Sequence, residues 1–438
     1  MIDNYEQALA FIHNRPRFKK KPTLSRMKLL LHRLGDPQRG QNYIHVTGTN
    51  GKGSVVAMTR QILMEQGLNV GTFTSPFITR FNERIAINGC PISDDDLVKY
   101  TDLVAKEVTK LDHELPEGGP TEFEINTAIM FCYFADHDLD VVILEVGIGG
   151  LYDSTNVIKA PLVSAIVTVG YDHMKYLGNS LPEIARQKAG IIKDDCPVVV
   201  GDLDPSAQDV IDKVAHGTGS KVFKPGKDYF FEVVSPQSLY TTVKYSGISL
   251  APDNYKLSLA GEYQAHNAGV AITIVQVVMK KLGISLDKRS IKRGLAHTKW
   301  PGRMELINEQ PVIILDGAHN LPGIQALVKT IRDDLKNQEV YILVAILADK
   351  QYDLMLGELA SLPNVHIFVT NFDGPYKGRK SADLSKIIQE IPSHYPIEII
   401  NNWQLGFAKI VHQMSEDDVL IVTGSLYFIS DVRHLMTD

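Results

Sequence analysis

The sequence is poor in cysteine and tryptophan and has no long apolar run. Its 438 residues include three cysteines and two tryptophans. Cys90, Cys132 and Cys196 form no CxxC pair, which argues against a disulfide framework or a zinc site and favours reduced packing thiols. No stretch of about 18 uncharged apolar residues could span a bilayer, and the start Met1–Glu6 lacks the basic and apolar regions of a secretory signal. We therefore expect a cytoplasmic protein without a membrane partner.

Basic residues are not in excess either. The formal net charge of −6 argues against nucleic-acid binding, which needs a broad basic surface. The densest basic run, residues 15–21, is short and ends at Pro22. This run fits a solvated loop better than an anion site, although both interpretations stay open. An anionic ligand would have to be held by local cations.

The composition and the hydrophobic pattern predict the fold class. A hydrophobic content of 44% in 438 residues is typical of a globular protein with two or three domains. Short apolar runs alternate with amphipathic segments, as in a mostly parallel sheet covered by helices. Between about 222 and 260, short alternating strands predict a β-hairpin at the edge of the first domain, and Lys299–Arg303 interrupts the helical pattern. We predict an α/β protein with two domains. Residues 1–297 form a P-loop ATPase-type domain with a mostly parallel sheet, and residues 298–438 form a smaller doubly wound domain.

The most informative segment is IHVTGTNGKGS, residues 44–54. An apolar strand leads into a glycine turn with one lysine, and a helical pattern, Val55–Gln66, follows. Such a turn presents backbone N–H groups to a phosphate, and Lys52 can reach the β and γ oxygens. The motif departs from a standard Walker A, because Val46 replaces the first glycine and Gly53 follows the lysine. A glycine-rich turn with a solvated lysine is the plain alternative, but the context favours a nucleoside triphosphate.

Polar residues stand where three apolar runs of the first domain stop. They are Ser75, Glu145 and His173. Because ligand groups gather at the carboxyl ends of parallel strands, these side chains could form a Mg²⁺ site near Lys52, completed by phosphate oxygens and water. Histidine is an uncommon Mg²⁺ ligand. The plain alternatives are a turn serine, a capping glutamate and a loop histidine.

Three further positions could carry chemistry. Asp316 and His319 follow an apolar run of the second domain and could contact ribose or phosphate, although an Asx-type turn capping a helix is the alternative. Arg303 could donate two hydrogen bonds to phosphate oxygens, or it could be a surface arginine beside Pro301. Lys188 lies in an apolar helical stretch, where a lysine usually extends to water.

These motifs together resemble the folylpolyglutamate synthase and dihydrofolate synthase family of the ATP-dependent Mur ligase superfamily. The matches follow the family's order and cover nearly the whole chain, which makes the resemblance highly specific. They are His45–Ser54, Phe73–Phe77, Arg80–Ile85, Leu144–Gly150, Asp172–His173, Leu177–Gly178, Lys188–Ile192, Gln264 with Asn267, Pro301–Arg303, Asp316–Asn320 and Thr423–Tyr427.

The resemblance implies a role for each matching position. It implies ATP contacts at Asn50, Gly51, Lys52, Gly53, Ser54, Asn267, Arg303 and Asp316, Mg²⁺ ligands at Ser75, Glu145 and His173, and catalytic positions at Lys52, Lys188 and His319. Lys188 matches a lysine that is carbamylated in the superfamily, and a carbamate there could hold a second Mg²⁺. The loop with Phe77 and Arg84 is similar to the one near the folate site.

The sequence departs from the family pattern in two places. Leu151 stands where many members carry a basic residue. The second domain is only loosely family-like near Asp349–Lys350 and Asp373–Pro375, which leaves the glutamate-binding contacts open.

The resemblance implies an amide-forming ligase with ATP and Mg²⁺ as cofactors. Phosphoryl transfer would activate a carboxylate as an acyl phosphate, which the amino group of L-glutamate then attacks. We therefore predict addition of L-glutamate to the γ-carboxylate of a reduced folate, with closure of the second domain excluding water. A dihydrofolate synthase that acts on dihydropteroate, an enzyme with both activities, a peptidoglycan Mur ligase and a non-catalytic nucleotide-binding module are the alternatives. We expect small-molecule substrates only and a monomer.

Overall fold

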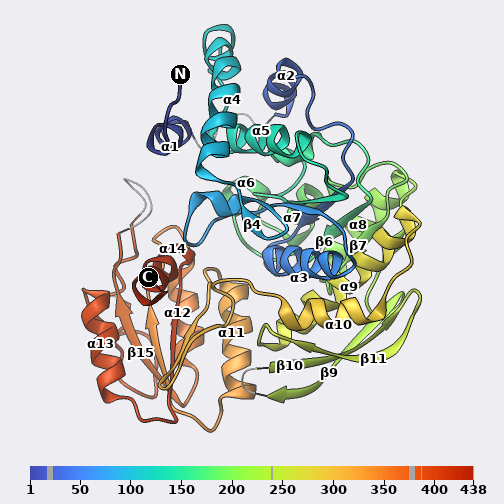
Figure 1. The fold of residues 1–438 in the computed structure, drawn as a ribbon. Helices are drawn as coiled ribbons and strands as arrows, with labels where there is room; N and C mark the ends of the chain where they lie inside the picture. The colour runs from blue at the N-terminus through green and yellow to red at the C-terminus, as the bar shows by residue number, and fades with distance from the viewer. Residues whose placement is uncertain (17–22, 238–239, 374–379, 386, 438) are drawn as a thin grey trace. The chain divides into compact units, whose positions relative to one another are not determined.

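The computed structural model describes residues 1–16, 23–237, 240–373, 380–385 and 387–437 (Figure 1). Residues 17–21 of the basic run and residues 374 and 375 lie outside this part. The chain forms two compact units. The first unit comprises Met1–Phe231, Tyr245–Asp253 and Asn267–Leu295, and the second comprises Glu232–Lys244, Asn254–His266 and Ala296–Asp438. Because the units alternate along the chain between residues 232 and 295, a domain boundary at residue 298 stays a prediction.

An eight-stranded sheet, in the order β4-β3-β2-β5-β1-β6-β7-β8, forms the centre of the first unit. Its strands are β1 (Tyr43–Thr47), β2 (Val70–Phe73), β3 (Ile85–Ile87), β4 (Cys90–Pro91), β5 (Val141–Glu145), β6 (Val163–Ile166), β7 (Val198–Val200) and β8 (Val222–Phe223). The pairs from β2 to β8 are parallel, whereas β3 pairs antiparallel with β2 and β4. The mostly parallel sheet confirms the predicted class. The neighbouring strands β5, β1, β6 and β7 are buried along their whole length and mostly apolar, because both faces of the sheet are covered there.

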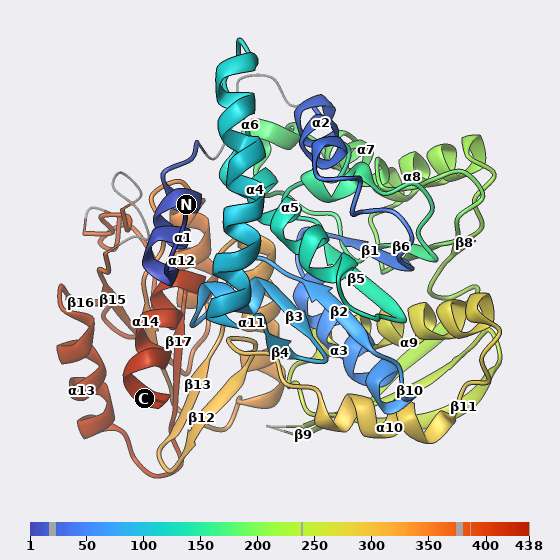
Figure 2. The same ribbon diagram turned by 45° about the horizontal axis from the view of Figure 1, so that its top comes forward.

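Helices cover both faces of this sheet. Among the helices of this unit are α1 (Tyr5–His13), α2 (Ser25–Arg33), α3 (Lys52–Glu65), α4 (Asp94–Glu114), α5 (Glu122–Ala135), α6 (Met174–Leu177), α7 (Leu181–Ala189), α8 (Pro205–Gly217) and α10 (Lys288–His297), with 3₁₀ turns η1 (Phe81–Arg84) and η2 (Ser154–Val157). Of these, α1 packs on α4 and α5, and α10 packs on α3. Helix α3 packs against β1, β2 and β5, and α5 lies on the opposite face (Figures 1 and 2). Helix α5 begins where Thr121 and Glu124 bond to each other's backbone N–H groups in a capping box.

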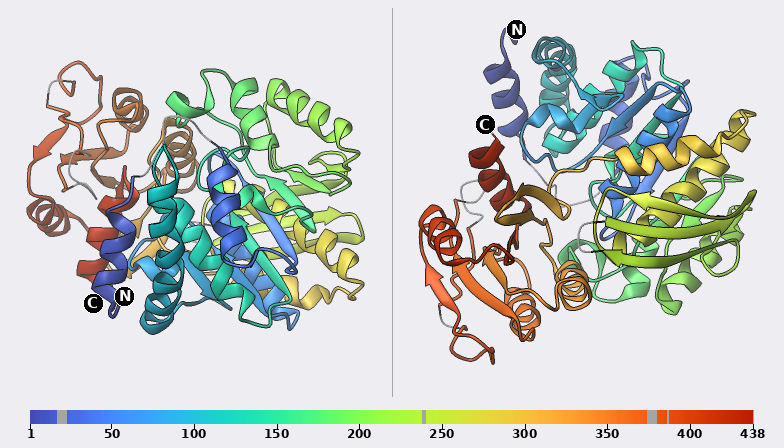
Figure 3. Two further views of the ribbon diagram at one scale, coloured as in Figure 1. Left: turned by 90° about the horizontal axis from the view of Figure 1, so that it is seen from above. Right: turned by 60° about the horizontal axis from the view of Figure 1, so that its bottom comes forward.

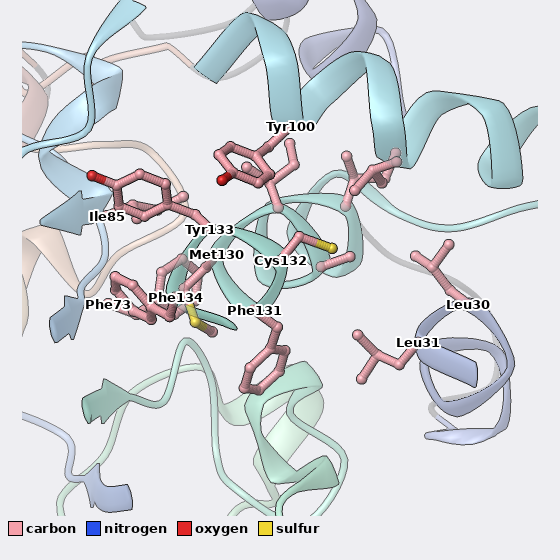
Figure 4. Packing of buried hydrophobic residues seen from close by; sticks show 14 of the residues in the cluster. Leu30, Leu31, Phe73, Ile85, Tyr100, Met130, Phe131, Cys132, Tyr133 and Phe134 are labelled. Atoms are coloured by element: carbon pink, nitrogen blue, oxygen red, sulfur yellow. The ribbon is translucent and has the colours of Figure 1, made fainter. Parts of the chain in front are cut away.

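The main core of the first unit lies around α5 (Figure 4). Met130, Phe131 and Phe134 of α5 are buried together with Tyr100 of α4 and Phe73 of β2. Helix α5 is apolar nearly all round, as expected for a helix enclosed between a sheet and other helices. This core therefore covers one face of β1, β2 and β5, which contribute Tyr43, Phe73, Val142 and Leu144 to it.

A separate three-stranded sheet follows the eight-stranded one. Its strands are β9 (Tyr229–Gln237), β10 (Tyr240–Gly247) and β11 (Leu250–Leu257), in the order β11-β10-β9, and helix α9 (Glu262–Leu282) comes next. The two strands expected between about 222 and 260 are present as the neighbouring strands β9 and β10, but the structure adds a third strand, β11, and forms a sheet separate from the eight-stranded one. Strand β11 contains Pro252, Asp253 and Asn254, residue types depleted in strands, which weakened its signal.

The second unit contains a six-stranded sheet in the order β12-β13-β17-β14-β15-β16. Its strands are β12 (Glu305–Glu309), β13 (Val312–Leu315), β14 (Val340–Val344), β15 (Val365–Thr370), β16 (Glu398–Ile400) and β17 (Val419–Thr423), and its helices are α11 (Leu321–Asp334), α12 (Tyr352–Ala360), α13 (Trp403–Gln413) and α14 (Leu426–Thr437). All pairs are parallel except the edge pair of β12 with β13. Ile342 and Val344 pack with α11 and α12, whereas Leu343 lies beside Gly406 of α13. Since neighbouring strand residues point to opposite faces, helices flank both sides (Figure 3), and the doubly wound prediction is confirmed.

Among the described residues, no helix has both the length and the apolar character needed to cross a bilayer.

Candidate active site

The glycine turn joins the central strand β1 to α3. Gly51 precedes the helix with a φ of 81°, in the left-handed region that favours glycine. A Cβ atom there would lie 2.4 Å from Oδ1 of Asn267 and 2.9 Å from Cγ1 of Val167. Only glycine therefore fits, and the fold brings together two of the expected ATP positions that are far apart in the sequence.

The turn is held by the segment that follows β6. The N–H of Asn50 donates to Oγ1 of Thr168 at 2.9 Å, and that hydroxyl donates to the carbonyl of Asn50 at 2.9 Å. Oγ1 of Thr49 bonds to the backbone of Gly170. The sequence analysis missed Thr168, because a threonine after a strand carries no distinctive signal. The first N–H groups of α3 have no acceptor within the helix, so the fixed turn presents donors to an anion.

Lys52 bends back over this turn. Its Nζ donates to the carbonyls of Gly48 at 3.0 Å and Thr49 at 3.3 Å. A triphosphate would offer the ammonium stronger, charged acceptors than these two carbonyls.

Ser75 and Glu145 meet at the ends of β2 and β5. The N–H of Ser75 donates to Oε2 of Glu145 at 3.1 Å, and the Glu145 residue is only 3% exposed. His173 follows β6 in the left-handed region, and its N–H donates to Oδ1 of Asp172 at 2.8 Å. In the part of the chain that is described, no three His, Cys, Asp or Glu side chains converge. A serine hydroxyl and one carboxylate nevertheless suit Mg²⁺, which usually takes its other ligands from phosphates and water.

Lys188 is 2% exposed on α7, so the interpretation that it extends to water is wrong. Burial lowers the pKa of this amine well below its ordinary value, the charge of Lys52 lowers it further, and Asp172 opposes the shift. Helix α7 also lies against the turn that follows β5, since a Cβ at Gly150 would be 3.0 Å from the Lys188 carbonyl. Lys188 is therefore a buried amine whose charged form is disfavoured, and it feels the charge of Lys52 in the glycine turn.

In the second unit, Asp316 follows β13 and is buried. Its Oδ2 accepts from the N–H of Met304 at 3.0 Å and from the hydroxyl of Tyr263 at 3.3 Å, and its Oδ1 accepts from the N–H of Ala318 at 3.0 Å. The bond to Ala318 forms the Asx turn that we considered as an alternative. This turn does not cap helix α11, because the cap is Asn320. Burial raises the pKa of Asp316, and the charge of Arg303 opposes this.

Arg303 and His319 lie beside the same strand end. A Cβ at Gly317 would be only 2.2 Å from Nη1 of Arg303, so glycine is required where the guanidinium passes. Nδ1 of His319 lies 2.8 Å from the Gly317 carbonyl and donates to it, which directs Nε2 away from the backbone. Tyr263 was missed, since a tyrosine at the start of a helix is common in cores.

The loop with Phe77 and Arg84 is folded by Glu83. That carboxylate accepts from the N–H groups of Ile78, Thr79 and Arg80 at 2.8 to 3.2 Å. The guanidinium carbon of Arg84 lies 5.2 Å from the centre of the Phe77 ring. The two positions expected on the folate side are thus in contact.

Comparison with known proteins identifies the family. Residues 46–275 match the Mur ligase middle domain, and residues 302–426 match the domain described as Mur ligase, glutamate ligase domain. A dihydrofolate synthase/folylpolyglutamate synthase of Bacillus subtilis is 38% identical over 437 residues, with 99% of each chain covered. The chain belongs to the folylpolyglutamate synthase and dihydrofolate synthase family. It is therefore a Mur-type ATP-dependent amide ligase, which confirms the resemblance.

Other members of the family agree in sequence and in fold. A folylpolyglutamate synthase of Lacticaseibacillus casei is 36% identical over 433 residues, with 99% of each chain covered. A solved FPGS–AMPPCP–folate complex has a TM-score of 0.87 and 36% identity and covers 100% of both chains. A folylpolyglutamate synthase of Thermotoga maritima has a TM-score of 0.84 and 32% identity, covering 99% of this chain and 96% of that one.

Proposed function

We propose that this ligase adds L-glutamate to the γ-carboxylate of a reduced folate through an acyl phosphate. The full-length match to folylpolyglutamate synthases, one of them solved with an ATP analogue and folate, carries the proposal. A carboxylate is a poor acylating agent, and transfer of the γ-phosphoryl group of ATP gives it a good leaving group. Attack by the glutamate amine then forms the amide and releases phosphate.

We assign the phosphate contacts to the turn and its helix. Asn50, Gly51, Lys52, Gly53 and Ser54 would hold the triphosphate through backbone N–H groups and the Lys52 ammonium. Asn267 supports this set because its Oδ1 lies beside Gly51. The family resemblance also assigns nucleotide contacts to Arg303, Asp316 and His319, and the half-buried Arg303 would neutralise charge on the phosphoryl group.

Ser75, Glu145 and His173 would hold Mg²⁺. The bond between Ser75 and Glu145 supports the first two, and His173 rests on the family resemblance alone. The bound ion would neutralise charge on the phosphates. We also propose that Lys188 is carbamylated, because burial favours the uncharged amine, which is the form that reacts with carbon dioxide, and the resulting carbamate would place an anion near Lys52.

Folate binding is proposed for the loop of Phe77 and Arg84. A planar ring could lie against Phe77, and the guanidinium of Arg84 could pair with a carboxylate. A second candidate function is the addition of the first glutamate to dihydropteroate, because the Bacillus subtilis relative carries both names. The monomeric state and the cytoplasmic location stay predictions.

The first experiment measures ADP release with Mg-ATP and L-glutamate. Tetrahydrofolate, 5,10-methylene-tetrahydrofolate and dihydropteroate serve as separate acceptors. Glutamate-dependent turnover with the folates alone supports a polyglutamate synthase, and turnover with dihydropteroate as well supports both activities. Absence of turnover with all three would contradict the proposal. Glu145→Gln should lose activity, whereas Glu107→Gln on α4, whose carboxylate pairs with the exposed Lys110, should keep it.

A further inference from the structure

A chain of buried hydrogen bonds links strand β1 to the turn after β5. Nε2 of His45 lies 2.8 Å from Oγ1 of Thr155, and that oxygen lies 2.6 Å from Oδ1 of Asp153. Oδ2 of Asp153 accepts from the N–H groups of Gly147 at 3.0 Å and Ile148 at 3.1 Å. All three side chains are buried.

The chemistry of the three side chains fixes the direction of every bond. Asp153 accepts four hydrogen bonds, because the N–H of Thr155 also donates to Oδ1 at 3.0 Å. Both of its oxygens are thus used as acceptors, as in an ionised carboxylate. Burial raises the pKa of this carboxyl, and the same four hydrogen bonds oppose that shift because they favour the ionised form. A hydroxyl donates only one hydrogen, so Thr155 gives it to Asp153 and must accept from Nε2 of His45. His45 therefore carries a proton on Nε2. Burial lowers the pKa of this imidazole to about 3, so Nδ1 carries no proton at neutral pH. Its Nδ1 has no hydrogen-bond partner among the described residues.

The turn held by Asp153 begins two residues after Glu145. A second bond from β1 holds the other side of the turn, since Oγ1 of Thr47 donates to the Gly149 carbonyl at 2.6 Å. Strand β1 also carries the glycine turn at its end. The two segments proposed to bind phosphate and Mg²⁺ are therefore fastened to one strand.

We propose that His45 is a positioning residue that acts through Thr155 and Asp153 to hold the turn after Glu145. The inference rests on the proposed function, because it requires that Glu145 binds Mg²⁺ in the ligase reaction. Without the Nε2 proton, the hydroxyl of Thr155 can rotate away from Asp153. The carboxylate of Asp153 is then less firmly oriented toward the N–H groups of Gly147 and Ile148. Residues behind metal ligands typically change metal affinity by about 10- to 100-fold when they are replaced.

The experiment compares variants that remove a donor with variants that keep it. His45→Phe keeps a ring without a proton donor, and His45→Gln places an amide N–H near the position of Nε2. Thr155→Val removes the hydroxyl, and Thr155→Ser retains it. Thr101→Val, which removes another buried hydroxyl on α4, is the matched control.

Two readouts are made on the full chain. The first is the Mg²⁺ dependence of ligase turnover, together with Mn²⁺ binding in the presence of AMPPCP. We expect the apparent metal constant to rise about tenfold or more in His45→Phe and Thr155→Val, and to stay within about twofold of wild type in the other three variants. The double variant His45→Phe/Thr155→Val should lose little more than either single variant, because both changes break one network.

The second readout is the ¹⁵N NMR spectrum of His45 in the wild-type chain. We expect a neutral ring protonated on Nε2 at pH 7. A proton on Nδ1, or wild-type Mg²⁺ dependence in folded His45→Phe and Thr155→Val, would overturn the inference. If His45→Phe fails to fold, the test is the difference in apparent metal constant between Thr155→Val and Thr155→Ser. Equal constants in these two variants would overturn the inference. Failure of the wild-type chain to ligate glutamate would instead overturn the proposed function, since Mn²⁺ binding and the tautomer need no turnover.

Discussion

Nζ of Lys52 donates to the carbonyl of Gly48, four residues earlier, at 3.0 Å. The side chain therefore folds over the turn and holds its charge where phosphate oxygens are proposed to bind. Lys52→Ala should reduce ligation by about 100-fold or more, as is typical when one donor to a developing charge is removed. Glutamate-dependent ADP release measures the loss. The exposed variant Lys106→Ala is the control, and near-normal turnover in a folded Lys52→Ala variant would contradict the phosphate assignment.

Gly51 should tolerate no side chain. Gly51→Ala would place a Cβ 2.4 Å from Oδ1 of Asn267 and force alanine to a φ of 81°. We expect the KM for ATP to rise and the melting temperature to fall. Gly217→Ala is the matched control, because its Cβ would meet nothing within 4 Å. The free energy of unfolding of Gly217→Ala should be unchanged or higher by about 0.4–1 kcal/mol. Equal losses of stability and of ATP affinity in Gly51→Ala and Gly217→Ala would contradict the explanation.

Stability should depend on pH through His45. Burial lowers the pKa of this imidazole to about 3 in the folded chain, whereas it is about 6.5 in an unfolded chain. The unfolded state alone binds the proton between these values, so this contribution to stability is complete above pH 6.5 and falls with decreasing pH. The slope is at most about 1.4 kcal/mol per pH unit.

Chemical denaturation between pH 4 and pH 8 measures this dependence. His45→Gln removes the titrating group and should flatten the profile. His113→Gln changes an exposed histidine at the end of α4 and serves as the control. An unchanged slope in His45→Gln would show that other groups dominate the acid sensitivity.

A buried ion pair should stabilise the α2–α5 contact. Nε of Arg26 donates to Oε2 of Glu124 at 2.9 Å, and both side chains are almost fully buried. Among the described residues, Arg26→Met would leave the carboxylate with the N–H and hydroxyl of Thr121 as donors. We expect this to cost about 3 kcal/mol or more of the free energy of unfolding. Lys28→Met on the exposed side of α2 should change it by about 0.5 kcal/mol or less. A similar small change in Arg26→Met would contradict the prediction.

Much of the fold could be predicted because its signals are local. The apolar runs that became β1, β5, β13, β14 and β17 are buried on both faces, so each is a continuous hydrophobic segment. Strands β11 and β12 were missed, since β11 carries Pro, Asp and Asn and β12 is a half-buried edge strand. Their existence depends on pairing with neighbours, which a local pattern does not contain.

Some features of the candidate site were likewise visible in the sequence, and others depend on the tertiary structure. The glycine turn, the strand-end polar residues and the order of the motifs were visible in the sequence, and they determined the family and the chemistry. The bond between Ser75 and Glu145, the packing of Asn267 against Gly51 and the burial of Lys188 came only from the tertiary structure. The network from His45 to Asp153 belongs to the second group. Residue types and spacings fix which groups a chain offers, whereas distances and burial between segments arise only when distant segments pack together.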